Sequence, residues 1–134
     1  MCMGNGRLAD LIIIVDDDEA VRRSLTLLLA SYDCEVVSFA SARALLAAPL
    51  CWDHRFCLVV DQDMPDMSGL DLLAILRAAG RTQPAVLITG LVDGRGRIET
   101  AAADLPGTIF LHKPIDADTL IGCVRLSLHG PAED

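Results

Sequence analysis

The chain reads Cys57-Leu58-Val59-Val60-Asp61-Gln62-Asp63-Met64-Pro65-Asp66-Met67-Ser68-Gly69 near its middle. Four apolar residues lead directly into an acid, and Pro65 prevents the predicted strand from continuing. A continuous apolar run is typical of a strand that is buried on both faces, as in a parallel sheet. Ser68 is a good N-cap for a helix, because leucines follow it at helical spacing. We therefore expect Asp61 at the carboxyl end of a buried strand, where open α/β sheets place their chemistry.

The rest of the chain alternates strand-like and helix-like segments in the same way. Besides the Asp61 strand, strands are predicted over residues 11–15, 34–39, 85–89 and 108–111. Helices are predicted over about 19–31, 41–49, 68–80, 95–103 and 116–128. This alternation predicts an α/β fold with helices on both faces of a doubly wound, five-stranded parallel sheet. The expected strand order is 2-1-3-4-5, the flavodoxin-like (βα)5 arrangement.

The length of 134 residues is that of one domain. The first predicted strand begins at Leu11 and the last predicted helix ends near Leu128. We therefore expect a leader over residues 1–10, a single domain over 11–128 and a tail over 129–134.

Composition and charge argue against several classes of protein. The formal net charge is -8 and the pI is about 4.6, so direct nucleic-acid binding is not expected, because an acidic chain gains nothing from counterion release. The apolar runs are too short to span a membrane. Five cysteines form no Cys-x-x-Cys pair, which predicts reduced thiols. Together these features predict a soluble cytoplasmic domain without a membrane partner.

Polar side chains follow four of the predicted strands. Asp16 and Asp17 follow the first strand, Asp61 ends the third, Thr89 ends the fourth, and Lys113 follows the fifth. In the order 2-1-3-4-5 these strand ends share one crevice. Two carboxylates ~4 Å apart repel by roughly 4 kcal/mol at an effective dielectric of about 20. A divalent cation relieves this repulsion, and oxygen ligands favour Mg²⁺, with Mn²⁺ as a substitute.

A metal in this crevice would let Asp61 act as a nucleophile toward phosphorus. The transferred phosphoryl group needs positive charge and hydrogen-bond donors on its oxygens. Lys113 would supply the first and the Thr89 hydroxyl the second.

These residues match a known family. From about Leu11 to Leu128 the chain resembles the receiver domain of bacterial two-component response regulators. The motifs that match are Val15-Asp16-Asp17, Asp61 to Pro65 with Gly69 beyond, Thr89-Gly90 and Lys113-Pro114. The resemblance implies that Asp61 is the phosphoacceptor and that Asp16, Asp17, Asp61 and the main-chain carbonyl of Asp63 hold Mg²⁺. It also implies that Thr89 and Lys113 bind the phosphoryl group and that Phe110 is a rotameric switch residue.

The resemblance also implies partners. The phosphoryl group would come from a sensor histidine kinase or a phosphotransfer protein. Phosphorylation would switch binding to a downstream protein, or to an output domain of the same polypeptide. A homodimer through the fourth helix, fifth strand and last helix is a further expectation. Such a domain catalyses only its own phosphorylation and slow dephosphorylation, so we do not expect a turnover enzyme.

Other interpretations remain open from the residues alone. An Asp-x-Asp pair after a buried strand, here Asp61 and Asp63, also resembles the nucleophile motif of haloacid-dehalogenase-type phosphatases. That motif wants Thr or Val where Pro65 stands, and its acidic metal pair comes last rather than first. A module that no longer uses phosphate is a third class. Asp18 is expected to cap a helix rather than bind metal, and Phe110 could be an ordinary core residue.

Overall fold

The computed structural model describes residues 10–90 and 105–130. Its centre is a five-stranded parallel sheet in the order β2-β1-β3-β4-β5. The strands span Leu11–Val15 (β1), Glu35–Phe39 (β2), Cys57–Asp61 (β3), Ala85–Thr89 (β4) and Thr108–His112 (β5). The predicted fold class and strand order are thereby confirmed.

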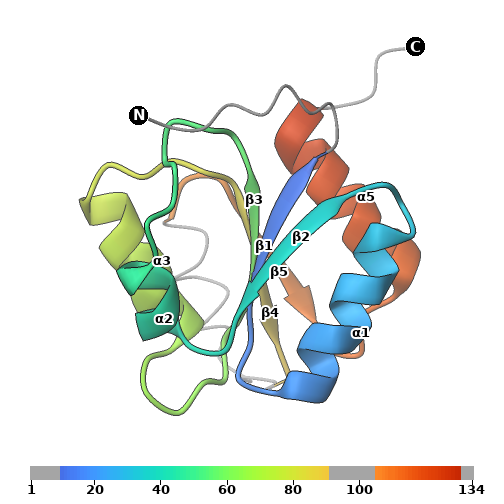
Figure 1. The fold of residues 1–134 in the computed structure, drawn as a ribbon, viewed down its shortest axis with the longest axis horizontal. Coiled ribbons are helices and arrows are strands. Elements are labelled where there is room, and N and C mark those ends of the chain that lie inside the picture. Colours follow the sequence, from blue (N-terminus) through green and yellow to red (C-terminus); the bar gives the residue numbers. More distant parts are fainter. Residues whose placement is uncertain (1–9, 91–104, 131–134) are drawn as a thin grey trace.

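Four described helices cover the sheet in two layers. They span Glu19–Ala30 (α1), Ala42–Ala47 (α2), Gly69–Ala78 (α3) and Ala117–His129 (α5). Figure 1 shows α1 and α5 together on one face of the sheet and α2 and α3 on the other. Both faces of the central strands are therefore covered, as the apolar runs predict.

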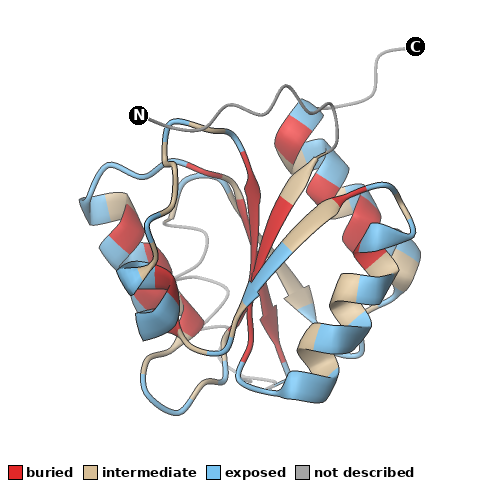
Figure 2. Ribbon diagram, viewed as in Figure 1, coloured by how far each residue is buried: buried red, intermediate tan, exposed pale blue. Residues whose placement is uncertain are grey.

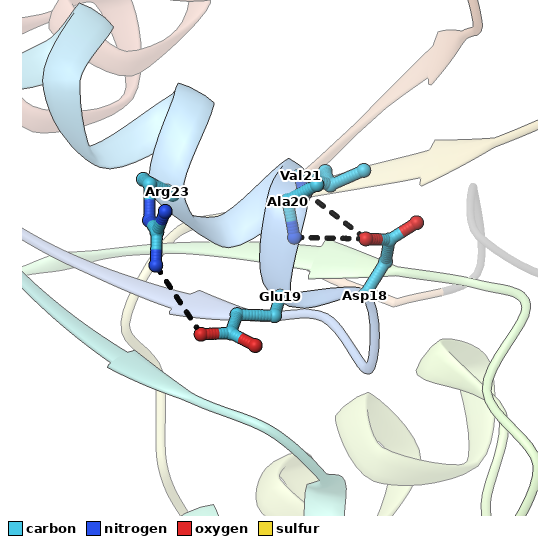
Figure 3. A network of polar contacts seen from close by, with 5 residues as sticks. All are labelled: Asp18, Glu19, Ala20, Val21 and Arg23. Atoms are coloured by element: carbon cyan, nitrogen blue, oxygen red, sulfur yellow. Dashed lines mark hydrogen bonds and ion pairs between the residues drawn. The ribbon is translucent and has the colours of Figure 1, made fainter.

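The first helix begins at a polar residue that directly follows the acidic end of β1. The Asp18 carboxylate accepts hydrogen bonds from the N–H groups of Ala20 and Val21, at 2.9 and 3.3 Å (Figure 3). A cap of this kind satisfies N–H groups that have no partner within the helix. Arg23 pairs with Glu19 at 3.3 Å on the exposed face of the same turn, where an ion pair contributes little stability (Figure 3). Asp18 is thus the helix cap that the sequence predicts.

The other described helices are capped at positions that the sequence also indicates. Ser41 caps α2, Ser68 caps α3 and Asp116 caps α5, each through its side-chain oxygen. Since each cap marks the point where loop becomes helix, local sequence alone fixes where these helices start.

The core consists of two mainly aliphatic clusters, one on each face of the sheet. Along β1, Ile13 and Val15 pack toward α2 and α3, whereas Ile12 and Ile14 pack toward α1 and α5. Residues of β3 alternate in the same way, because successive strand side chains point to opposite faces. Figure 2 shows the central strands as the most buried part of the molecule.

The element boundaries differ slightly from those predicted. β2 begins at Glu35 rather than Cys34, because Asp33 adopts a left-handed conformation (φ 63°) and the Cys34 N–H still bonds to the Leu29 carbonyl at 3.3 Å. The helix predicted over 95–103 lies outside the described residues. So do residues 1–9 of the predicted leader and 131–134 of the predicted tail.

Of the cysteines in the described residues, one departs from expectation. Cys34, Cys57 and Cys123 are free thiols as predicted, but Cys51 is disulfide-bonded. Reduced thiols throughout the chain were therefore the wrong expectation. Among the described residues, no helix is long and apolar enough to cross a membrane.

Candidate functional site

Asp61 is the last residue of β3, and the chain that follows it is held on both sides. All five residues of β3 are buried between β1 and β4. The Gln62 N–H donates to the Ile88 carbonyl at 2.7 Å, and the Gln62 carbonyl accepts from the Gly69 N–H at 3.2 Å. The Gln62 side-chain oxygen also accepts from the Leu70 N–H at 2.8 Å. The loop between β3 and α3 therefore closes beside Asp61.

Gly69 allows this close approach of α3 to the strand. A Cβ at this position would lie 2.6 Å from Cδ1 of Leu87 and 2.8 Å from the Asp61 carbonyl oxygen. Both distances are shorter than real Cβ contacts, so no larger residue fits without a shift of the backbone. Close packing beside Asp61 therefore explains why the motif has glycine at position 69.

Three carboxylates from two strand ends gather at one edge of the sheet. One oxygen from each of Asp16, Asp17 and Asp61 lies within 4.8 Å of the others. Asp16 and Asp61 are buried and Asp17 is exposed. β1 and β3 are adjacent and parallel, so their carboxyl ends bring these acids together. The convergence of these three acids is as the sequence predicts.

Lys113 reaches this cluster from the loop between β5 and α5. Its Nζ lies 3.3 Å from Oδ1 of Asp61. Its backbone N–H donates to the Thr89 carbonyl at 2.8 Å, which extends the pairing of β5 with β4 by one residue. The Lys113–Pro114 peptide bond is cis. A cation therefore lies beside the carboxylate of Asp61, the predicted phosphoacceptor.

Burial sets the electrostatics of the cluster. Burial raises the pKa of the Asp61 carboxyl, the Asp16 carboxylate raises it further, and Lys113 opposes both effects. Burial likewise raises the pKa of Asp16, against the hydrogen bond at 2.9 Å that its Oδ1 accepts from the Asp18 N–H. Burial lowers the pKa of the Lys113 ammonium, but the surrounding carboxylates outweigh this and its net shift is upward. Two acids here hold their protons more tightly than free aspartic acid does.

The donor set fits a magnesium ion. Three carboxylate oxygens within 4.8 Å of one another are hard ligands of the kind that Mg²⁺ prefers. Burial and, to a smaller extent, neighbouring carboxylates raise the pKa values of Asp16 and Asp61, and a divalent cation would offset both effects by stabilising the charged carboxylates. The residues that would hold it are Asp16, Asp17 and Asp61.

The other predicted site residues lie around this cluster. Thr89 ends β4 and is fully buried. Phe110 pairs with Leu87 in the β4–β5 register, so it lies on the same face of the sheet as Thr89. Its half-buried ring packs edge-on against His112, with the ring centroids 4.7 Å apart. Asp63 is exposed, and its side chain points across the site to Gly90.

One contributor to the site was not predicted from the sequence. The Arg22 guanidinium donates to the main-chain carbonyl of Asp16 at 2.7 Å. It thereby holds the β1–α1 loop from the first turns of α1. Arg22 carries no distinguishing sequence signal, because a charged residue on a surface helix is ordinary.

An apolar cavity of about 360 Å³ borders the acidic cluster. It opens between α1, the end of β4 and the start of the loop before α5. Its apolar lining is formed by Ala20, Val21, Leu25, Ile88, Pro114 and Ile115, and Asp16 and Lys113 stand at its polar side.

Comparison with known proteins shows which family this chain belongs to. The model of the response regulator receiver domain matches residues 12–125. The chain belongs to the response regulator receiver domain family. The transcriptional regulatory protein FixJ of Azorhizobium caulinodans is 42% identical over 120 residues, which cover 90% of this chain and 56% of that protein. The response regulator protein TmoT of Ectopseudomonas mendocina is 37% identical over 120 residues, 87% of this chain and 52% of that protein.

A solved structure agrees with the sequence comparisons. The crystal structure of FixJ-N superposes with a TM-score of 0.79 at 32% identity, and the match covers 95% of this chain and 99% of that one. The chain is a response regulator receiver domain of two-component signalling. It spans about half the length of the curated relatives it matches.

Family membership decides against one of the sequence-based alternatives and gives two general properties of the family. The haloacid-dehalogenase alternative is not supported, because the family model and the relatives all point to receivers. Receiver domains are generally not enzymes, and they typically bind Mg²⁺ at an acidic pocket.

Proposed function

We propose that this receiver accepts a phosphoryl group on Asp61, with Mg²⁺ held by Asp16, Asp17, Asp61 and the main-chain carbonyl of Asp63. The observation that carries the proposal is the arrangement around Asp61. Its carboxylate belongs to a cluster of three acids and has Lys113 Nζ at 3.3 Å. A nucleophile, a metal cage and a cation for the phosphoryl oxygens are thus together in one place.

The proposed reaction transfers one phosphoryl group. An Asp61 carboxylate oxygen forms a bond to phosphorus, and the phosphorus–nitrogen bond of a phosphohistidine donor breaks. The electron pair of that bond leaves with the imidazole nitrogen of the donor. When bound, Mg²⁺ supplies positive charge that stabilises the phosphoryl oxygens in the transition state.

The residues of the chain have separate tasks in this proposal. Asp61 attacks as the ionised carboxylate. Lys113 pairs with a phosphoryl oxygen once the Asp61 charge has been used in the new bond. The Thr89 hydroxyl donates to another phosphoryl oxygen, and Phe110 on the same face of the sheet would respond to that movement. Hydrolysis of the acyl phosphate would be slow and the domain would have no external substrate.

The proposed partners follow from the family and from the shape of the site. The phosphoryl donor is a histidine kinase or a phosphotransfer protein, and the apolar cavity beside Asp16 and Lys113 gives such a partner a surface to pack against. The chain spans about half the length of its relatives. We propose that phosphorylation changes its binding either to a further domain or to a separate downstream protein. We also propose a homodimer that uses the helix predicted over 95–103 together with β5 and α5, the domain limits 11–128 and a cytoplasmic location.

Acetyl phosphate tests the proposal directly. With Mg²⁺, the wild-type protein should gain the mass of one phosphoryl group, and the addition should disappear when EDTA removes the metal. The Asp61→Asn variant should gain none. Asp66→Asn, which changes an exposed acid on the same loop, is the matched control and should label like wild type.

Three outcomes would overturn the proposal. Labelling that persists in Asp61→Asn would place the acceptor elsewhere. Continuous release of phosphate from p-nitrophenyl phosphate, without a stable acyl phosphate, would point to a phosphatase. Absence of any labelling in wild type would favour a module that no longer uses phosphate.

A further inference from the structure

The Asp63 carboxylate bridges two loops at the rim of the site. Its Oδ2 accepts a hydrogen bond from the Gly90 N–H at 3.3 Å, so the loop after β3 is tied to the residue after β4. Asp63 belongs to no strand or helix, and it is exposed. Neither sheet pairing nor helix capping accounts for this contact.

The same two residues border the space in front of Asp61. A Cβ on Gly90 would lie 3.4 Å from Cδ of Lys113, whose Nζ contacts the Asp61 carboxylate. The Asp63 carboxylate is also close enough to Lys113 to contribute to the upward shift of the pKa of that lysine. Asp63 therefore adds a fourth carboxylate to a site that already has three.

We propose that the Asp63 side chain is a brake on the phosphorylated state. It holds the Gly90 N–H while Asp61 is unmodified, and it must release Gly90 when a phosphoryl group arrives. This inference rests on the proposed function of Asp61. It concerns the side chain of Asp63, whereas the proposed metal ligand is the main-chain carbonyl of that residue.

The physical reason is repulsion between like charges. An acyl phosphate on Asp61 carries more negative charge than the carboxylate that it replaces, and phosphate groups approach −2 at neutral pH. Two charges of the same sign at this range oppose each other by an amount that matters in a partly buried site. Because the Asp63 side chain is exposed, it can rotate into water at small cost. Gly90 then loses its tie to the β3–α3 loop.

Asp63 thus acts through Gly90 and is a positioning residue. While Asp63 holds Gly90, phosphorylation must break this hydrogen bond and displace the Asp63 side chain, which makes the phosphorylated state less favourable. Removing the charge should favour the phosphorylated state, and removing the acceptor oxygen as well should also free the Gly90 N–H without phosphorylation. Asp63→Asn and Asp63→Ala separate these two effects, because asparagine keeps an acceptor oxygen on a side chain of the same length and alanine does not.

The first test measures affinity for beryllofluoride, a phosphoryl mimic, in the presence of Mg²⁺. Asp63→Asn should bind the mimic roughly five- to tenfold more tightly than wild type, because one opposing charge is gone. Asp66→Asn removes the same charge from the same loop, but the Asp66 carboxylate pairs with Arg43 at 3.5 Å, so its affinity should stay within about twofold of wild type. An unchanged or weaker affinity in Asp63→Asn would overturn the brake.

The second test needs neither metal nor phosphate. The Gly90 amide resonance of the unliganded protein should shift, and its hydrogen exchange should accelerate, in Asp63→Ala but much less in Asp63→Asn. A Gly90 amide that is identical in wild type and Asp63→Ala would show that the contact does not hold Gly90 and would overturn the proposal. If wild type neither bound the mimic nor became phosphorylated, the function proposed for Asp61 would be wrong. The Gly90 amide measurement would still show whether the Asp63 side chain holds Gly90.

Discussion

Asp16 and Asp61 are two buried acids, and burial disfavours the charged form of each carboxyl group. Folding removes both carboxyls from water and places them beside each other, and Lys113 offsets this only in part. A site arranged in this way favours any ligand that brings positive charge to the carboxylates. The cost in stability and the capacity to hold a cation have the same physical origin.

The exposed acid of the cluster gives the cleanest test of the metal cage. Asp17→Asn should weaken Mg²⁺ binding by at least about tenfold, because an amide oxygen replaces a charged ligand. Isothermal titration calorimetry measures this loss. Asp18→Asn is the matched control, since asparagine caps a helix as well as aspartate and the neighbouring charge is still removed. Equal losses in the two variants would place the metal near Asp18.

Helix α3 is the element whose placement shapes the site most closely. Its cap at Ser68 fixes where it starts, and its first residue, Gly69, lies so close to β3 that a Cβ there would be 2.8 Å from the Asp61 carbonyl oxygen. The Gln62 side chain satisfies a second N–H of the first turn, at Leu70. Strand, loop and helix therefore form one closed unit behind Asp61.

Two glycine substitutions test this contact. Gly69→Ala should destabilise the protein by about 1–3 kcal/mol, because the new methyl group would overlap Leu87 and the Asp61 carbonyl. Gly122→Ala in α5 is the control: a Cβ there meets nothing within 4 Å, and the change should stabilise by about 0.5–1 kcal/mol. Urea denaturation measures both. Gly69→Ala at wild-type stability would mean that α3 can move away from the strand freely.

The free energy of unfolding of the domain should depend on pH because Asp16 and Asp61 are buried. In the metal-free protein the pKa values of Asp16 and Asp61 lie above the ordinary value of 3.8, so the folded state binds these protons more tightly than the unfolded state does. Their contribution to stability is complete below pH 3.8 and is lost as the pH rises through the raised folded values.

A comparison with Asp61→Asn isolates this contribution. The free energy of unfolding of Asp61→Asn minus that of wild type, measured in EDTA, should grow as the pH rises from about 3.8 toward 7. Saturating Mg²⁺ should stabilise wild type and shrink the difference, because the ion binds only the folded cluster. A difference that is constant with pH, or that falls, would contradict the raised pKa of Asp61.

The sequence by itself determined the sheet, the caps and the strand ends that carry the site. Apolar runs that end in acid identify β1 and β3, and Asp18, Ser41, Ser68 and Asp116 mark helix starts, because strand periodicity and capping depend on neighbours along the chain. Strand order then brought Asp16, Asp17 and Asp61 to one edge. Local signals were sufficient for all of this.

Only the tertiary structure decided how these groups act on one another. The 3.3 Å pairing of Lys113 with Asp61, the hold of Arg22 on the Asp16 carbonyl and the tie from Asp63 to Gly90 are distances across loops that sequence spacing does not set. The need for glycine at position 69 and the raised pKa values of Asp16 and Asp61 appear only once the neighbours and their burial are known. Steric contact and desolvation depend on the packing of residues far apart in the chain, and no pattern along the sequence contains that packing.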